Sequence, residues 1–227
     1  VFGRRMRLVR YGVATLLGIL VSLPATQQWE DLLLFRNSQT FGVSDPQFGA
    51  DVGFYVFRLP LISFLSDWLF AALLLIIIIT AITHVLNGAV LFAGMIPTVR
   101  QATKVHMAVL LAILAILRAG DYWLARFDLT NETRGVVQGA TYAVVNAELP
   151  ALMLLILIAL LTAVLFLVTI RTDRWRFPLI ASALWLVVSI GGGSVYPSLI
   201  QSLVVRPNQA ERELPYIARN VEATRAA

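Results

Sequence analysis

The stretch LFAALLLIIIITAI, residues 69–82, decides the fold because it contains no charged side chain. It lies inside a longer apolar segment, residues 66–92, in which Asp67 is the one acidic residue. At about 1.5 Å of rise per residue, a helix over this segment reaches roughly 40 Å. About 20 apolar residues suffice to cross the hydrocarbon core of a bilayer. We therefore predict a transmembrane helix that tilts or extends into the headgroup region.

The composition of the whole chain agrees with a membrane protein. Of its 227 residues, 59% are hydrophobic and 14% are charged, whereas a soluble domain has roughly 45 to 50% apolar and about 25% charged residues. Four further apolar segments each approach the length of a span, residues 8–24, 104–124, 150–170 and 177–196. The first lacks an A-x-A cleavage site, which favours a span over a signal peptide.

These segments predict an all-α integral membrane protein with five transmembrane helices and structured extracytoplasmic loops. We divide the chain into a transmembrane domain, residues 1–196, and a juxtamembrane segment, residues 197–227. The juxtamembrane segment contains Pro215, which we expect to open a short helix with Ile217 and Val221 on one face. So short an apolar face needs a partner, and we interpret the segment as the start of a longer extracytoplasmic domain.

The basic residues predict the orientation in the membrane. Residues 1–10, 93–104 and 171–176 together hold nine of the 18 Lys and Arg residues but only one of the 13 acidic residues. Short basic connections remain in the cytoplasm, so we expect a cytoplasmic N-terminus and an extracytoplasmic C-terminal tail. Because the basic residues cluster at membrane boundaries rather than on a polar face, we expect no nucleic-acid partner.

Ionisable groups at membrane depth are functional candidates because each costs a few kcal/mol unless it is paired or hydrated. His84 and His106 lie on consecutive antiparallel spans, and we expect them to approach each other in the cytoplasmic leaflet. Two histidines make an incomplete metal site, so we interpret them as interfacial imidazoles, with a proton or metal role as the alternative. Arg118 and Asp121, three residues apart, can pair on one helical face. We expect this pair to anchor the outer end of its span, or alternatively to line a polar cavity.

The first outer loop contains the motif FGVSDPQFGADVGFYVFRLP, residues 41–60. Asp45 precedes a proline and favours a turn, and Asp51 lies between glycines that tolerate positive φ. A calcium or acid–base role for the two aspartates is the alternative, although their spacing matches no calcium-binding loop. The chain has no Cys, Walker loop, H-E-x-x-H or G-x-S-x-G motif. We therefore predict no catalytic residue, no cofactor and no bound metal.

Three segments carry a resemblance to a known family. They are the loop at residues 41–60, the sequence Gly-Ala-Thr-Tyr at residues 139–142, and the tail at residues 196–225. Together they resemble uncharacterised protein family 0182, a family of bacterial multi-pass membrane proteins. The resemblance implies about seven spans followed by a large extracytoplasmic domain, of which this chain holds the last five spans and the beginning of the domain. It implies no activity, so no residue inherits a catalytic role.

Three functions compete on these observations. The first is a noncatalytic anchor, scaffold or subunit of a cell-envelope complex in the bacterial plasma membrane, with membrane lipids and envelope proteins or a second copy as partners. The second is a transporter or channel for lipid or another amphiphile. The third is an enzyme that acts on lipid-linked envelope material through Asp45, Asp51 or Glu148. We rank them in this order because the first requires the fewest additional groups.

Overall fold

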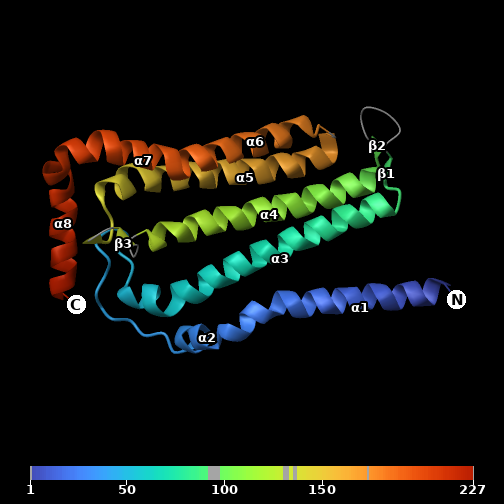
Figure 1. Ribbon diagram of the computed structural model, residues 1–227, viewed down its shortest axis with the longest axis horizontal. Helices are drawn as coiled ribbons and strands as arrows, with labels where there is room; N and C mark the ends of the chain where they lie inside the picture. The colour runs from blue at the N-terminus through green and yellow to red at the C-terminus, as the bar shows by residue number, and fades with distance from the viewer. Residues whose placement is uncertain (1, 92–97, 130–132, 135–136, 173, 227) are drawn as a thin grey trace.

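The computed structural model describes residues 2–91, 98–129, 133–134, 137–172 and 174–226. Among these residues the regular structure is helical apart from two pairs of two-residue strands and an isolated bridge. Five long helices alternate in direction along the molecule (Figure 1). They are α1 (Phe2–Ser22), α3 (Leu59–Leu86), α4 (Gln101–Asp128), α5 (Leu149–Thr172) and α6 (Arg176–Ile190).

The two ends of this array differ. At one end, here the hairpin end, lie the N-terminus, the turn from α5 to α6, and strands β1 (Val90–Leu91) and β2 (Thr98–Val99). At the other end, which we call the tail end, lie the connecting elements η1 (Leu23–Gln27), α2 (Trp29–Arg36), β3 (Thr133–Arg134) and β4 (Val137–Gln138). The tail helix α8 (Gln209–Ala226) lies at the same end. The described residues of the three basic segments, 2–10, 98–104, 171–172 and 174–176, therefore belong to the hairpin end. That this end faces the cytoplasm stays a prediction.

Four helical stretches are long and apolar enough to cross a membrane: Phe54–Leu86, Gln101–Asp128, Val144–Thr172 and Arg176–Glu222. They contain or overlap the predicted spans at 66–92, 104–124, 150–170 and 177–196. The span predicted to end at residue 92 stops earlier, since Gly88 with φ +66° leaves the helix and leads into β1. The apolar part of the first helix, Tyr11–Gln27, is shorter, so the count of five spans stays a prediction.

Prolines occur inside the helices next to π-helical turns. The four turns are η2 (Phe54–Arg58), η3 (Val144–Glu148), η4 (Gly191–Val195) and η5 (Gln201–Val205), and a proline follows each after one intervening residue. Before Pro60, for example, the N–H of Leu59 bonds the carbonyl of Phe54, five residues earlier. The same bond joins Leu149 to Val144. A proline has no N–H and its ring collides with the carbonyl four residues back, so the wider turn lets the helix continue.

This arrangement changes two sequence interpretations. The helix that begins at Arg176 does not end at residue 196, where we predicted the last span to end, but continues through η4, α7 (Tyr196–Ile200), η5 and η6 (Arg206–Asn208). The tail helix α8 begins at Gln209, so Pro215 lies inside it and does not open it. Six residues of α8 precede Pro215. Because proline has no N–H, the carbonyl of Glu211, four residues earlier, lacks its usual helical hydrogen bond.

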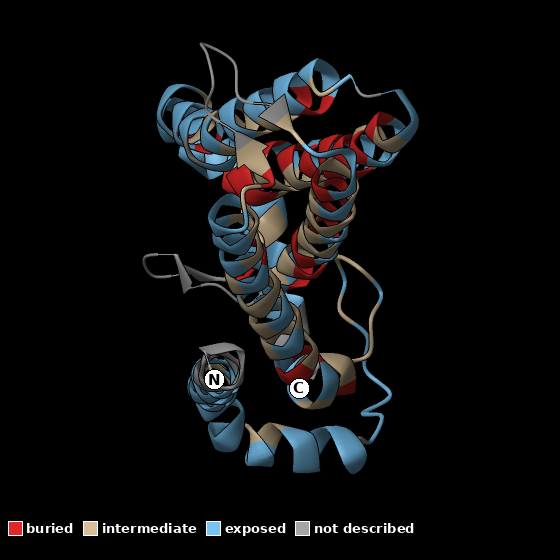
Figure 2. Cartoon of the chain, turned by 90° about the vertical axis from the view of Figure 1, so that its right-hand side faces the viewer, coloured by how far each residue is buried: buried red, intermediate tan, exposed pale blue. Residues whose placement is uncertain are grey.

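The core lies between α4 and α5, which make the most extensive helix contact in the structure. Many of the buried residues there are small and recur on one face: Ala108, Ala112, Ala115 and Ala119 on α4, and Ala151, Ala159, Thr162 and Ala163 on α5. Larger buried side chains of α5, Leu155 and Phe166 among them, complete the core. Figure 2 shows this buried strip between helices whose other faces are exposed. Small side chains let two helix backbones approach closely, which is the usual way to pack helices in lipid. Helices α3 and α6 pack against this pair.

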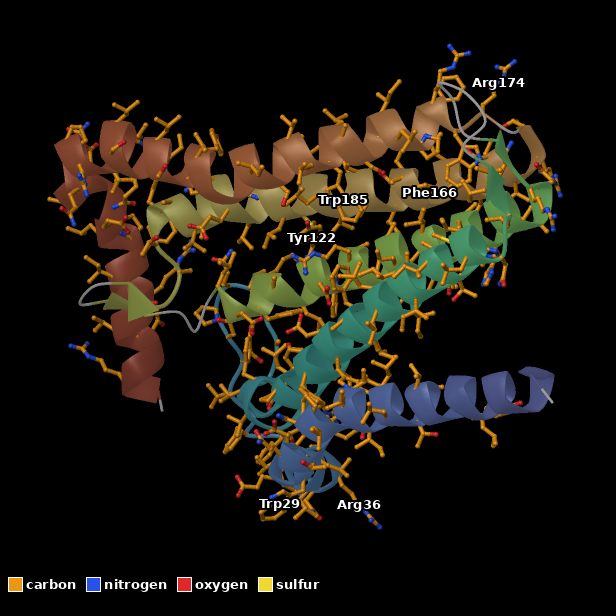
Figure 3. All side chains as sticks on the ribbon, turned by 45° about the vertical axis from the view of Figure 1, so that its right-hand side comes forward. Trp29, Arg36, Tyr122, Phe166, Arg174 and Trp185 are labelled. Carbon is orange, nitrogen blue, oxygen red and sulfur yellow. The ribbon has the colours of Figure 1, made fainter. Side chains whose placement is uncertain are left out.

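Helix α1 stands apart from the other four (Figures 1 and 3). The indole Nε1 of Trp68 on α3 donates a hydrogen bond of 2.8 Å to the carbonyl of Val21. Beyond that link, a cavity of about 570 Å³ separates the two helices. Its lining is apolar apart from a threonine: Val13, Ala14, Leu17, Gly18, Val21, Ala72, Leu75, Ile76, Ile79 and Thr83. Most of the large apolar side chains of α1 are therefore exposed on the surface of the protein.

Candidate functional site at the tail end

Asp51, a candidate acid–base or calcium-binding residue, stabilises a turn through hydrogen bonds to the backbone. Its carboxylate accepts backbone N–H groups from Phe41 at 3.1 Å, Gly42 at 2.9 Å and Gly53 at 2.7 Å. These hydrogen bonds, of which that from Phe41 is the strongest influence, lower the pKa of Asp51 below its ordinary value. Gly53 is required at its position, since a Cβ there would lie 2.1 Å from the carbonyl oxygen of Gln39.

Asp45 makes a similar set of contacts within the same loop. One carboxylate oxygen accepts N–H groups from Gln47 at 3.1 Å and Phe48 at 2.6 Å, and the hydroxyl of Tyr55 at 3.2 Å. The sequence motif at residues 41–60 thus forms a folded turn in which two aspartates accept hydrogen bonds from backbone N–H groups. Glu148, the third carboxylate of the enzyme hypothesis, lines a cavity elsewhere whose lining includes neither aspartate. The three carboxylates therefore do not converge on that cavity.

The two histidines meet at the hairpin end. Nε2 of His84 lies 3.3 Å from Nδ1 of His106, and Nδ1 of His84 lies 3.2 Å from the hydroxyl of Thr103. A neighbouring cavity of about 440 Å³ is lined by His84, Thr103, Lys104 and Trp175 together with apolar side chains. Among the described residues, no three His, Cys, Asp or Glu side chains gather closely enough to hold a metal ion. The pair can share a hydrogen bond and thereby link α3 to α4.

Arg118 and Asp121 form the predicted ion pair. Nη1 of Arg118 lies 3.1 Å from Oδ2 of Asp121, whose exposed fraction is 8%. The hydroxyl of Ser66 on α3 donates to the other oxygen of Asp121. The Asp121 carboxylate is therefore satisfied by one positive and one neutral partner, as a group at membrane depth requires.

Aromatic rings extend this ion pair to a third helix. The Arg118 guanidinium lies 5.3 Å from the ring centre of Phe70 and 4.9 Å from that of Tyr122. The indole Nε1 of Trp185 on α6 donates to the hydroxyl of Tyr122 at 3.1 Å, and Figure 3 shows these two rings between α4 and α6. The network thus joins α3, α4 and α6; Asp121 is buried in it, whereas the Arg118 side chain is 37% exposed.

The largest polar cavity among those described lies at the tail end and measures about 680 Å³. It forms where the start of the α5 stretch, the end of the α6 stretch and the tail helix α8 meet, and we call it the tail cavity. Its lining residues are Ala140, Thr141, Ala143, Glu148, Gly193, Pro197, Ser198, Gln201, Arg206, Gln209, Glu213, Tyr216, Ile217 and Asn220. Sequence reasoning considered only Glu148 among its charged residues and missed Arg206 and Glu213.

Specific contacts dock α8 beside this cavity. The backbone N–H of Tyr142 donates to Oε2 of Glu213 at 3.1 Å, and Glu213 is only 9% exposed. The side-chain amide of Asn146 donates to the hydroxyl of Tyr216 at 2.9 Å. The rings of Tyr142 and Tyr216 meet edge to face with centroids 6.1 Å apart. The motif at residues 139–142 and the tail, both chosen for their family resemblance, therefore contact each other.

Gly139 lets α8 come this close. Its φ is +108°, a conformation that L side chains rarely adopt. A Cβ at this position would lie 2.8 Å from Oδ1 of Asn220 on α8. The position therefore favours glycine for two independent reasons, the backbone conformation and the approach of the tail helix.

Comparison with known proteins places the chain in a family. All of residues 1–227 match the profile of the family described as "Uncharacterised protein family (UPF0182)", and the chain belongs to this family. It is 42% identical over 222 residues to a UPF0182 protein of Frankia alni, covering 98% of this chain and 22% of that protein. It is 40% identical over 217 residues to a UPF0182 protein of Thermobifida fusca, covering 96% of this chain and 21% of that protein. The chain thus spans about a fifth of the length of these relatives. No solved structure matches it.

Proposed function

We propose that this chain is a noncatalytic membrane anchor that holds the segment after its last span in a fixed orientation, as a scaffold or subunit of a bacterial envelope complex. The observation that carries the proposal is the docking of α8 on the connection between α4 and α5. A polar helix that did not have to hold the following segment in place would need neither the buried contact of Glu213 nor the glycine at residue 139 that makes room for the helix. The docked helix offers its exposed face to partners.

The described spans support a structural role. At membrane depth, Arg118 and Asp121 pair with each other and with neutral neighbours. The α4–α5 interface contains a row of small buried residues that lets the two helices pack closely. A rigid pair of helices ending beside α8 is a suitable base for an oriented tail.

The proposed orientation places the hairpin end in the cytoplasm and the tail end outside. It rests on the gathering of the three basic segments at one end. Single cysteines at Thr172 and Ser202 test it, since the chain has no Cys of its own. In right-side-out vesicles we expect an impermeant maleimide to label S202C and to label T172C only after lysis. The opposite labelling would overturn the orientation.

Purification tests the scaffold role. The full-length protein is extracted from its native membrane in mild detergent, as wild type and as the variants Gly139→Ala and Gly120→Ala. We expect envelope proteins at fixed stoichiometry with wild type and with G120A, because a Cβ at Gly120 meets nothing within 4 Å. With G139A, in which the strain at the positive φ of residue 139 loosens the segment that docks α8, we expect the partners to fall away at equal membrane level. A lone wild-type protein, or partners indifferent to G139A, would contradict the proposal.

A second candidate function, transport of a lipid or another amphiphile, is favoured by the cavity between α1 and α3. Its lining is apolar apart from Thr83 and extends from Val13 to Val21 on α1 and from Ala72 to Thr83 on α3, which gives an acyl chain an apolar surface. Gly18→Leu would fill it, because a Cβ at Gly18 meets nothing within 4 Å. Movement of fluorescent lipid in reconstituted vesicles that G18L abolishes would place this function first, and no movement with wild type would remove it.

A further inference from the structure

We propose that the tail cavity binds the headgroup of a membrane lipid that carries both an amine and a phosphate, that is, an aminoalkyl-phosphate lipid. This goes beyond the anchor role, which needs only the protein contacts of α8. The size of the cavity is suitable, because its roughly 680 Å³ lies within the range of small-molecule sites.

The position of the cavity indicates a ligand from the membrane. It lies where two long apolar stretches end, Val144–Thr172 and Arg176–Glu222, and such ends reach the headgroup region of a bilayer. On the side of the spans its lining combines small or apolar residues, Ala143, Gly193 and Pro197, with the polar Ser198 and Gln201. On the side of α8 the lining is mostly polar, with Gln209 and Glu213 beside Ile217. A lipid headgroup with its first chain atoms likewise presents both polar and apolar groups.

The charges of the lining indicate an amine. Glu213 is 9% exposed, and its Oε2 accepts the backbone N–H of Tyr142. Among the described residues, the structure gives this carboxylate no ion-pair partner. A buried charge without an opposite charge is costly, and a cation beside it removes that cost. The ring of Tyr216, which already has the Arg219 guanidinium 5.7 Å from its centre, lines the same cavity and shows that a cation is accommodated there.

The same lining also offers a group for phosphate. Arg206 is the basic residue in the lining, and a guanidinium binds phosphate oxygens through paired N–H donors. With Glu148 and Glu213 the lining holds two carboxylates and one guanidinium. This set matches a ligand with one positive and one negative group better than it matches a free anion. The amine contacts Glu213 and the phosphate contacts Arg206.

Lipid retention tests the proposal. The full-length protein in nanodiscs made of equal parts phosphatidylethanolamine and phosphatidylglycerol is transferred to mild detergent, and retained lipid is measured by native mass spectrometry. We expect wild type to retain phosphatidylethanolamine selectively. Glu213→Gln keeps an oxygen for the Tyr142 N–H but loses the charge, and we expect about tenfold less retention. Arg206→Gln should reduce retention similarly, while the exposed controls Glu222→Gln and Arg225→Gln should retain as much as wild type.

Competition with free phosphoethanolamine separates the two sources of the headgroup. We expect millimolar phosphoethanolamine to leave the retained lipid in place, since it lacks the chain atoms for the apolar side. Displacement by the free headgroup, retention without headgroup preference, or equal retention in E213Q and wild type would each overturn the proposal. Hydrogen exchange of α8 in the same samples distinguishes failure of the lipid proposal from failure of the anchor role. We expect E213Q to leave the exchange of α8 unchanged, since the anchor role does not depend on the charge.

Discussion

The first and last helices of the chain, α1 and α8, are attached to the bundle in opposite ways. Helix α1 is apolar, yet its large side chains are exposed, as Leu16 and Ile19 illustrate, and Trp68 supplies the hydrogen bond that ties it to α3. Helix α8 is the more polar of the two by sequence, yet Glu213 and Tyr216 fix it to the α4–α5 connection. In a membrane protein, apolar surface needs no protein partner, because lipid covers it. Polar contacts therefore decide which helix has a defined place.

The largest expected effect comes from Gly139→Ala, which would make α8 as loosely attached as α1. The new Cβ conflicts with the positive φ, at a cost of about 1–3 kcal/mol, and the end of the Asn220 side chain must shift to make room for it. We expect amide hydrogen exchange across residues 209–226 to accelerate. The matched control is Gly120→Ala, which removes a glycine from an exposed helical position and should stabilise α4 by about 0.5–1 kcal/mol. Unchanged exchange of α8 in G139A would contradict the docking.

Glu213→Ala should have the next largest effect on α8. It leaves the N–H of Tyr142 without its acceptor, which costs about 1–3 kcal/mol for a buried donor. Limited proteolysis should then cut within residues 209–226 earlier than in wild type. Glu222→Ala, at an exposed position of the same helix, should be cut at the wild-type rate. Equal rates for the two variants would show that the contact does not hold the helix.

A smaller effect is expected on the opposite helix from Trp68→Phe. This change keeps a ring on α3 but removes the donor to the Val21 carbonyl, a bond with a net contribution of about 0.5–1.5 kcal/mol. Exchange of the amides at residues 11–27 should accelerate while that of α8 stays unchanged. Faster exchange in both helices would mean that their attachments are coupled, which would contradict the independent attachment of α1 and α8.

The smallest effect concerns the turn around Asp51. Its pKa is lowered in the folded protein, so the carboxylate stabilises the turn above the pKa of the unfolded chain, about 4. That contribution disappears as the pH falls below about 4 and through the lower folded value. We expect the amides of Gly42 and Gly53 to stay protected from pH 7 to pH 4 and to open below. Opening of the wild-type turn near pH 6, or an Asp51→Asn variant as protected as wild type at pH 7, would contradict this account.

The sequence predicted four long apolar helices well, because an uninterrupted apolar run indicates a helix able to cross a membrane whatever it contacts. Residues 69–82 are the plainest case. The meeting of His84 with His106 and of Arg118 with Asp121 was also predictable, since both follow from helix spacing or from antiparallel neighbours.

The docking of the tail could not be predicted in the same way. Tyr142 and Glu213 lie 71 residues apart, and no pattern in either segment indicates that the two residues meet. Gly139 carried a signal only in its family motif, since the reason for a glycine there appears once Asn220 is placed beside it. The π-helical turns escaped notice because a proline normally predicts the end of a helix.

A distance measurement tests the central claim most directly, that α8 is fixed to the bundle while α1 is not. Spin labels on Leu154 of α5 and Ala218 of α8 form one pair, and labels on Leu154 and Leu20 of α1 form the other, all at exposed positions. In the full-length protein in nanodiscs, with cysteines outside these residues replaced, pulsed electron resonance should give a narrow distance distribution for the α8 pair. The α1 pair should give a broad one. A broad distribution for the α8 pair would contradict the account.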